Sequence, residues 1–190
     1  MKLSRTLLSA AAATAAVFAL ATSAQAALPA VAVPCALTDI SPTAEACKGF
    51  FAGQYLSGSP GDIAVATEAL ADLGFTWDGN LAAITAAGNN LSGLGGATLI
   101  DFPGLLSGIT FIGVHVGKGN RTAYPGVEST AFYRFDAGAG LDTFTLNLDA
   151  SSDVVLYKTD PVSFVPEPET YALMLAGLGA VGFVARRRRA

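Results

Sequence analysis

Short apolar runs separated by turn-forming residues fill the second half of the sequence, and they constrain the fold more than any other feature. The clearest alternation places Phe144, Leu146 and Leu148 on one side of a strand. The run at residues 108–117 is apolar on both faces, which favours a central strand. The four runs are residues 108–117, 130–136, 143–148 and 153–158. Short strands about ten residues apart with glycine-rich turns predict a mainly β (α+β) body, an antiparallel β-sandwich or jelly-roll-like fold.

One helix is predicted ahead of these strands. Ser59 is a suitable N-cap, Pro60 suits the first helical position, and Gly74 is a plausible C-terminal stop. The apolar residues in between share one helical face: Ile63, Ala66, Leu70 and Leu73. We expect residues 81–97 to form a loop with one short helix.

The N-terminus has the composition of a secretory signal peptide. Lys2 and Arg5 precede an apolar stretch, residues 7–21, and the small-x-small sequence 24–26 follows it. We therefore predict a signal peptide at residues 1–26 that is cleaved after Ala26, with the Sec machinery and signal peptidase as partners. The alternative is an uncleaved N-terminal anchor.

The charge of the middle of the chain argues against one class of partner. Outside the two terminal segments, 13 acidic residues face 5 basic ones, a net charge of −8. Such a body is repelled by phosphates, so no nucleic acid partner is expected.

The two cysteines, Cys35 and Cys47, are close in the sequence of a chain predicted to be exported. Because export leads to an oxidising compartment, a disulfide is expected, with free thiols as the alternative. No metal site or cofactor is expected, since these cysteines and the single histidine supply too few ligands.

Candidate chemical groups in the body are few. We expect His115 to be a strand histidine satisfied by hydrogen bonds, because no motif supplies it with a nucleophile. A carboxylate pair for a hydrolase would come from aspartates that we place at turns: Asp136, Asp142, Asp149 and Asp153. Residues 138–142 resemble one unit of a calcium-binding repeat, with a plain hairpin as the alternative. Aromatic residues could form a sugar-binding platform: Trp77, Tyr124 and Tyr133.

The C-terminus combines three features in a fixed order. Pro166, Glu167 and Pro168 precede an apolar run, residues 171–185, and the cluster Arg186, Arg187, Arg188 and Arg189 follows. A helix over the run would be about 23 Å long, shorter than the bilayer core of about 30 Å. By the positive-inside rule the arginines stay cytoplasmic and the acidic body lies outside. We predict a stop-transfer anchor with a protease-accessible neck.

This arrangement resembles the PEP-CTERM sorting signal of Gram-negative bacteria. The resemblance implies recognition by an exosortase, a membrane cysteine protease thought to cleave near Pro-Glu-Pro and to release or transfer the protein to the cell surface. It implies that Pro166, Glu167 and Pro168 are recognition residues and that the anchor is transient. More loosely, residues 46–51, 61–62 and 131–138 are similar to the bodies of other PEP-CTERM proteins, which are associated with strains that make exopolysaccharide.

These observations lead to an ordered set of hypotheses. The chain has a signal peptide (1–26), an exported β-rich domain (27–164) and a sorting signal (165–190). We expect a non-enzymatic surface or extracellular matrix protein associated with exopolysaccharide or biofilm. A carbohydrate-binding module is the alternative, and a secreted hydrolase comes third.

Overall fold

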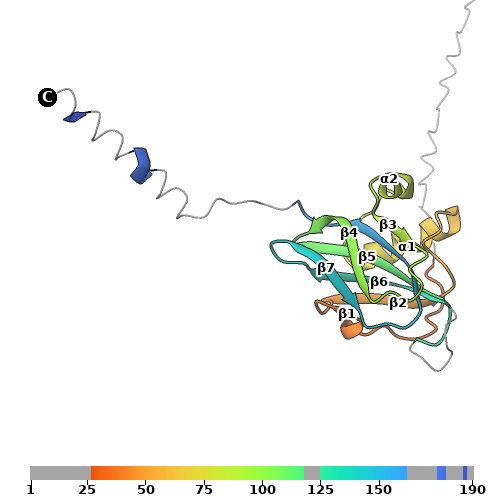
Figure 1. The fold of residues 1–190 in the computed structure, drawn as a ribbon. Helices are drawn as coiled ribbons and strands as arrows, with labels where there is room; N and C mark the ends of the chain where they lie inside the picture. Colours follow the sequence, from red (N-terminus) through yellow and green to blue (C-terminus); the bar gives the residue numbers. More distant parts are fainter. Residues whose placement is uncertain (1–26, 118–124, 162–174, 179–185, 188–190) are drawn as a thin grey trace, which may run out of the picture.

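Two antiparallel β-sheets form the body of the protein, with a helix against one of them (Figure 1). The computed structural model describes residues 27–117, 125–161, 175–178 and 186–187. The elements are η1 (Leu37–Asp39), β1 (Ile40–Ser41), β2 (Ala46–Ala52), α1 (Pro60–Asp72), α2 (Leu81–Ala86), β3 (Asn90–Ser92), β4 (Leu99–Leu106), β5 (Ile109–Val116), β6 (Ser129–Asp136), β7 (Leu141–Leu146) and β8 (Ser151–Lys158). The prediction of a mainly β fold with antiparallel sheets is confirmed.

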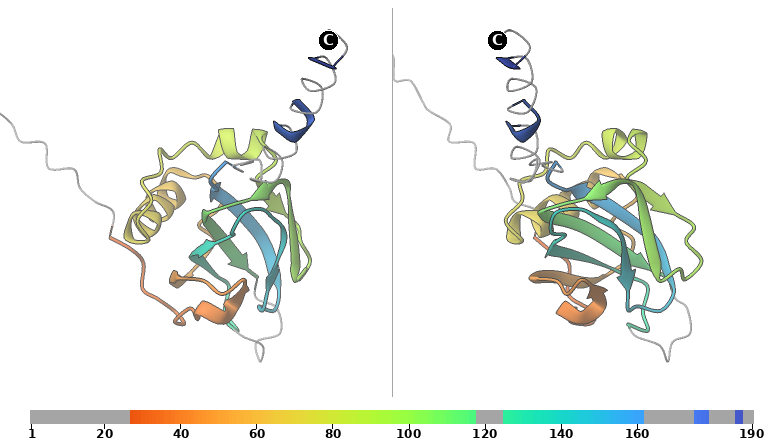
Figure 2. Two further views of the ribbon diagram at one scale, coloured as in Figure 1. Left: turned by 90° about the vertical axis from the view of Figure 1, so that its left-hand side faces the viewer. Right: turned by 60° about the vertical axis from the view of Figure 1, so that its left-hand side comes forward.

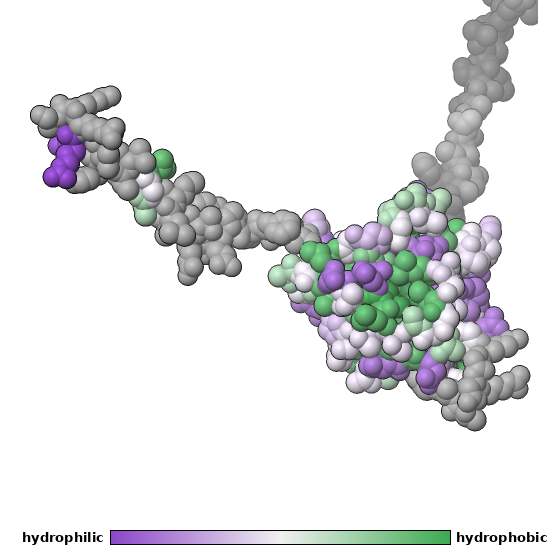
Figure 3. Space-filling view, viewed as in Figure 1, coloured by the Kyte–Doolittle hydropathy of each residue, from purple (hydrophilic) through white to green (hydrophobic). Residues whose placement is uncertain are grey.

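The smaller sheet has the strand order β1-β7-β4 and the larger one β2-β6-β5-β8-β3. Their facing sides bury one apolar core. Its largest fully buried members include Phe135, Phe144, Ile100, Ile112 and Leu146. Figure 2 shows the ribbon of the body in two further views. Figure 3 shows a green, apolar area on the face of the body that is turned toward the viewer.

The other face of the larger sheet packs on α1, so the body has three layers. Ala66, Ala69 and Leu70 of α1 share a second core with Phe111 and Phe132 of the sheet. The start of the helix is as predicted, because the Ser59 hydroxyl oxygen accepts a hydrogen bond from the Asp62 backbone N–H at 3.2 Å. The chain leaves the helix through Gly74, which has a positive φ of 93°.

Central placement explains why β5 is apolar on both faces. It is the middle strand of its sheet, and one face meets the smaller sheet while the other meets the α1 layer. All four predicted runs are strands, with bounds that differ by up to two residues, and the short helix expected within residues 81–97 is α2.

Four strands, β1 to β4, were not predicted from the sequence. β4 contains Pro103 and Gly104, residues that argue against a strand unless it lies at an edge. It is indeed an edge strand, paired only with β7. β2 contains Gly49 at a register shift, where a Cβ would lie 2.7 Å from the carbonyl oxygen of Thr130. Only glycine fits this bulge, and its presence hides the strand pattern.

Candidate functional site

The predicted sorting residues fall at the edge of what the structure describes. Pro166, Glu167 and Pro168 lie outside the described residues, as do Arg188 and Arg189. Residues 175–178 form one helical turn in which Leu175 and Leu178 are exposed, and 186–187 are also helical and exposed. Within the described ranges, no helix has the length and apolar character needed to cross a membrane. The signal peptide and the cleavage point after Ala26 also lie outside the described residues.

The body ends at a set of hydrogen bonds that we call the C-terminal clamp, formed by Thr159 and Asp160 with residues 107–109. The backbone N–H of Asp160 donates to the carbonyl oxygen of Ser107 at 2.9 Å, and the N–H of Ser107 donates to the Thr159 hydroxyl oxygen at 2.8 Å. The N–H of Ile109 donates to Asp160 Oδ2 at 3.2 Å. Since Ser107 is only 3% exposed, this clamp holds the chain in place up to six residues before Pro166.

Cys35 and Cys47 form a disulfide, as expected for an exported chain. Cys47 lies in β2, so the bridge ties the segment before η1 to an edge strand of the larger sheet. Both cysteines pack against the core between the sheets. The disulfide therefore holds the segment before η1 against this core.

His115 lies in β5 as predicted, buried among polar groups on the α1 side of the sheet. Its Nδ1 is 2.6 Å from the hydroxyl oxygen of Ser152 and 3.3 Å from Asp153 Oδ2. The side-chain N–H of Gln54 also donates to Asp153 Oδ2, at 2.9 Å. Burial lowers the pKa of His115 below its ordinary value, and the charges of Asp153 and Glu128 oppose that effect.

The arrangement around His115 does not suit nucleophilic catalysis. A catalytic histidine receives a proton at one ring nitrogen while a carboxylate holds the other. Here the hydroxyl of Ser152 and the carboxylate of Asp153 both face Nδ1, while Nε2 is buried with no hydrogen-bond partner among the described residues. The expected full hydrogen bonding of this histidine is thus correct for one nitrogen and wrong for the other.

The candidate aspartates take different places. Asp136 is exposed, and its carboxylate accepts the backbone N–H of Gly138 at 2.8 Å, as a turn aspartate does. Asp149 is exposed between β7 and β8. Asp142 and Asp153 were predicted at turns, but they lie inside β7 and β8. The turn predictions for these two are wrong because both strands begin two residues earlier than the apolar runs do.

The glycine-rich turn at residues 137–140 is not the hairpin considered as the alternative to a calcium site. It joins β6 of the larger sheet to β7 of the smaller one, so it crosses between the two sheets. No group of three or more His, Cys, Asp or Glu side chains gathers to hold a metal ion within the part of the chain that is described.

The aromatic candidates for a sugar platform lie inside the body. Tyr133 is fully buried, and Trp77 is 7% exposed with its ring edge-on to Tyr157 at a centroid distance of 4.8 Å. Tyr124 is outside the described residues. Trp77 and Tyr133 therefore stabilise the two cores and offer no exposed stacking face.

Two features have no signal in the sequence. The hydroxyl of Tyr133 donates to Asp39 Oδ2 at 2.8 Å, although the residues are 94 positions apart and Asp39 is 5% exposed. Crevices of about 400 Å³ and 390 Å³ flank α2. The first is lined by Trp77 and Asp78, and the second by Ala83, Ile84 and residues 156–159.

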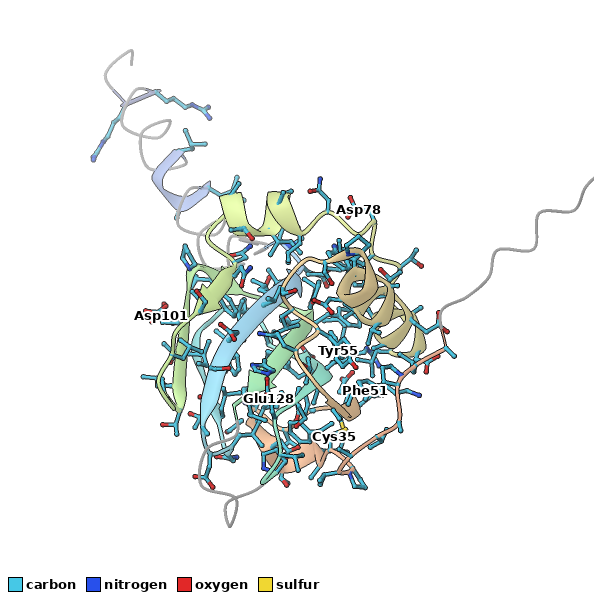
Figure 4. All side chains as sticks on the ribbon, turned by 90° about the vertical axis from the view of Figure 1, so that its right-hand side faces the viewer. Cys35, Phe51, Tyr55, Asp78, Asp101 and Glu128 are labelled. Atoms are coloured by element: carbon cyan, nitrogen blue, oxygen red, sulfur yellow. A yellow bond between two sulfur atoms is a disulfide. The ribbon has the colours of Figure 1, made fainter. Side chains whose placement is uncertain are left out.

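Figure 4 shows that the labelled polar side chains lie in different parts of the body. Asp78 lies beside α2, whereas Glu128 and Cys35 lie toward the opposite end, and Asp101 lies at a distant edge. These carboxylates do not share one cleft.

Comparison with known proteins finds one match, and it lies at the C-terminus. The model of the PEP-CTERM protein-sorting motif matches residues 164–189. No curated protein and no solved structure matches the chain. The chain therefore carries a PEP-CTERM protein-sorting motif, which implies export, transient anchoring in the membrane and processing by an exosortase on the way to the cell surface.

Proposed function

We propose that the chain is a non-enzymatic surface or extracellular matrix protein of a Gram-negative bacterium, which acts with exopolysaccharide in biofilm. The observation that carries this proposal is the sorting motif at residues 164–189. Exosortase recognises Pro166, Glu167 and Pro168, and the arginine cluster Arg186–Arg189 keeps the chain from passing fully through the membrane until it is processed.

The chemistry of the body supports a structural role. Its one histidine has both polar partners on the same ring nitrogen, so it cannot relay a proton between them. The net charge of −8 between the terminal segments keeps such a body soluble at the cell surface.

A carbohydrate-binding module stays the alternative function, although the aromatic platform suggested by the sequence does not support it. Trp77 and Tyr133 are core residues, so they do not supply the exposed rings that stack on sugars. Retention of the purified protein on a matrix of the producing strain's polysaccharide would favour this alternative.

Mass spectrometry of the mature protein tests the sorting part of the proposal. In cells with active exosortase we expect a C-terminus upstream of residue 171, and in cells without the protease the intact Ala190. An intact C-terminus in cells with active exosortase would refute processing.

A matched pair of variants tests the role of the motif itself. Glu167→Gln should slow processing, because it changes the acidic residue between the two prolines. Glu169→Gln removes the same charge two residues away and should process normally. Equal processing of both variants would show that Glu167 is not a recognition residue.

The biofilm role needs its own experiment. Deletion of the coding sequence should lower the exopolysaccharide retained on the cells, and the unprocessed variant should not restore it. Unchanged polysaccharide retention after deletion would remove the matrix role while leaving the sorting route intact.

A further inference from the structure

The C-terminal clamp fixes the point at which the folded body ends and the connection to the predicted anchor begins. Hydrogen bonds from Ser107, Ile109 and Asp160 hold the chain through residue 160. Asp160 also forms an ion pair with Lys158 at 3.4 Å, and it packs on Gly108, where a Cβ would lie 2.6 Å from Asp160 Oδ2. The position of the body relative to the membrane therefore depends on the residues that follow 160.

The connection from the clamp to the apolar run is short. Ten residues, 161–170, separate Asp160 from Tyr171. A chain of this length spans about 36 Å when fully extended and about 18 Å on average when flexible. A compact body of 135 residues has a radius of gyration of about 14 Å, which corresponds to a sphere about 37 Å across.

These lengths restrict how the anchored body can turn. If the end of the body that carries the clamp faces the membrane, the connection needs only its average length. If the opposite end faced the membrane, the clamp would lie about 37 Å away, which is the full reach of the connection. Because extending a chain fully costs most of its conformational entropy, the connection is least strained when the clamp end faces the bilayer.

Helix α2 lies at this same end. Ala83, Ile84 and Ala87 line a crevice together with residues 156–158 of β8 and with Thr159 of the clamp. Figures 1 and 2 show α2 projecting from the body near the end of β8 in each view. β8 begins at Ser151, so Asp149 lies at the far end of the body.

The surface at the α2 end differs in charge from the rest of the body. Residues 79–100 contain no charged side chain, although the region between the terminal segments has a net charge of −8. No residue of α2 is buried, and Figure 3 shows the helix mostly in pale green and white. Asp78 and Lys158 line the crevices that flank the helix, and Lys158 is paired with Asp160. Asp62 lies nearby at the start of α1, where it binds Ser57 of a third crevice that α2 lines.

We propose that the α2 end of the body is a membrane-facing surface, which rests against the lipid headgroups while the chain is anchored. This inference rests on the transient anchoring that the sorting motif implies. An uncharged, alanine-rich surface avoids the repulsion that an acidic body experiences near anionic lipids. It keeps the connection relaxed and holds Pro166, Glu167 and Pro168 close to the bilayer, where a membrane protease works.

Quenching by labelled lipids tests this orientation. The full chain is reconstituted in vesicles of phosphatidylethanolamine and phosphatidylglycerol that contain a nitroxide headgroup lipid. A fluorophore is attached through Ala86→Cys in α2 or through Asp149→Cys at the far end, both exposed positions. We expect at least twofold stronger quenching at residue 86. Equal quenching, or stronger quenching at residue 149, would overturn the proposal.

Two controls keep the outcomes separate. Thr85→Cys, exposed in the same helix, replaces the first variant if that one fails to fold. Flotation with the vesicles reads anchoring independently, so a chain that does not float contradicts the anchor itself. A chain that floats without preferential quenching contradicts only the orientation. Ala83→Glu should reduce the quenching at residue 86 because it adds a negative charge to the surface facing anionic lipid.

Discussion

The hydrogen bond between Tyr133 and Asp39 offers the sharpest test of the core. Its oxygen atoms are 2.8 Å apart, Tyr133 is fully buried and Asp39 is 5% exposed. Tyr133→Phe removes only the hydroxyl group and keeps the ring in the core between the sheets. The loss falls on a carboxylate that water cannot easily reach.

The expected cost follows from burial and from the nature of the acceptor. A hydrogen bond to a carboxylate contributes about 1.5–3 kcal/mol, more than a neutral one. After the substitution, Asp39 Oδ2 keeps the backbone N–H of Ala36, at 2.8 Å, so the carboxylate is not left without a donor. We therefore expect the free energy of unfolding to fall by about 2 kcal/mol.

Tyr55→Phe is the matched control, because it removes the same atom from the surface. The Tyr55 hydroxyl donates to the carbonyl oxygen of Ala52 at 2.9 Å in an exposed position. Water can replace this bond, so the expected cost is below about 0.5 kcal/mol.

Urea denaturation followed by tryptophan fluorescence measures both variants. With a slope of about 2 kcal/mol/M for a domain of this size, Tyr133→Phe should lower the midpoint by about 1 M. The midpoint of Tyr55→Phe should stay within about 0.25 M of the wild type. If Tyr133→Phe costs no more than Tyr55→Phe, the buried bond does not stabilise the fold and the reasoning fails.

Three further predictions concern the same fold. Reducing the disulfide between Cys35 and Cys47, which are 12 positions apart, should lower the free energy of unfolding by about 3 kcal/mol, measured with and without reductant; no change would contradict it. Because burial lowers the pKa of His115 in the folded state, the unfolded chain takes up the proton first, so stability should fall as pH drops below about 6.5. His115→Asn should reduce this loss of stability below about pH 6.5. An unchanged pH profile would argue against His115 as its cause. Gly113→Ala should cost about 1–3 kcal/mol in thermal unfolding, since a Cβ there would lie 2.8 Å from a buried leucine methyl. Gly104→Ala, with no atom within 4 Å of its Cβ, should be close to neutral, and similar losses in both would contradict the packing argument.

Local patterns predicted the elements whose signals lie within a few residues. The cap at Ser59 and the apolar face that follows it specify α1 without reference to the rest of the chain. The apolar run around Ile112 predicts a central strand, because only a strand covered on both faces buries both sets of side chains. The nearby cysteines likewise predicted their own pairing.

The strands that were missed owe their existence to partners far away in sequence. β4 contains Pro103 and is stable because β7 pairs with it, about 40 residues later. Gly49 is tolerated in β2 because β6 approaches so closely that no side chain fits. A local sequence pattern therefore cannot predict either contact.

The same division holds for the function. The sequence by itself determined where the chain goes, because a sorting motif is read as a linear segment by the export and processing machinery. Only the tertiary structure decided that Trp77, Tyr133 and His115 are buried, since burial depends on which faces of the sheets are covered. It also decided that the clamp at Asp160 and the uncharged helix α2 lie at one end, because β8 carries the chain there.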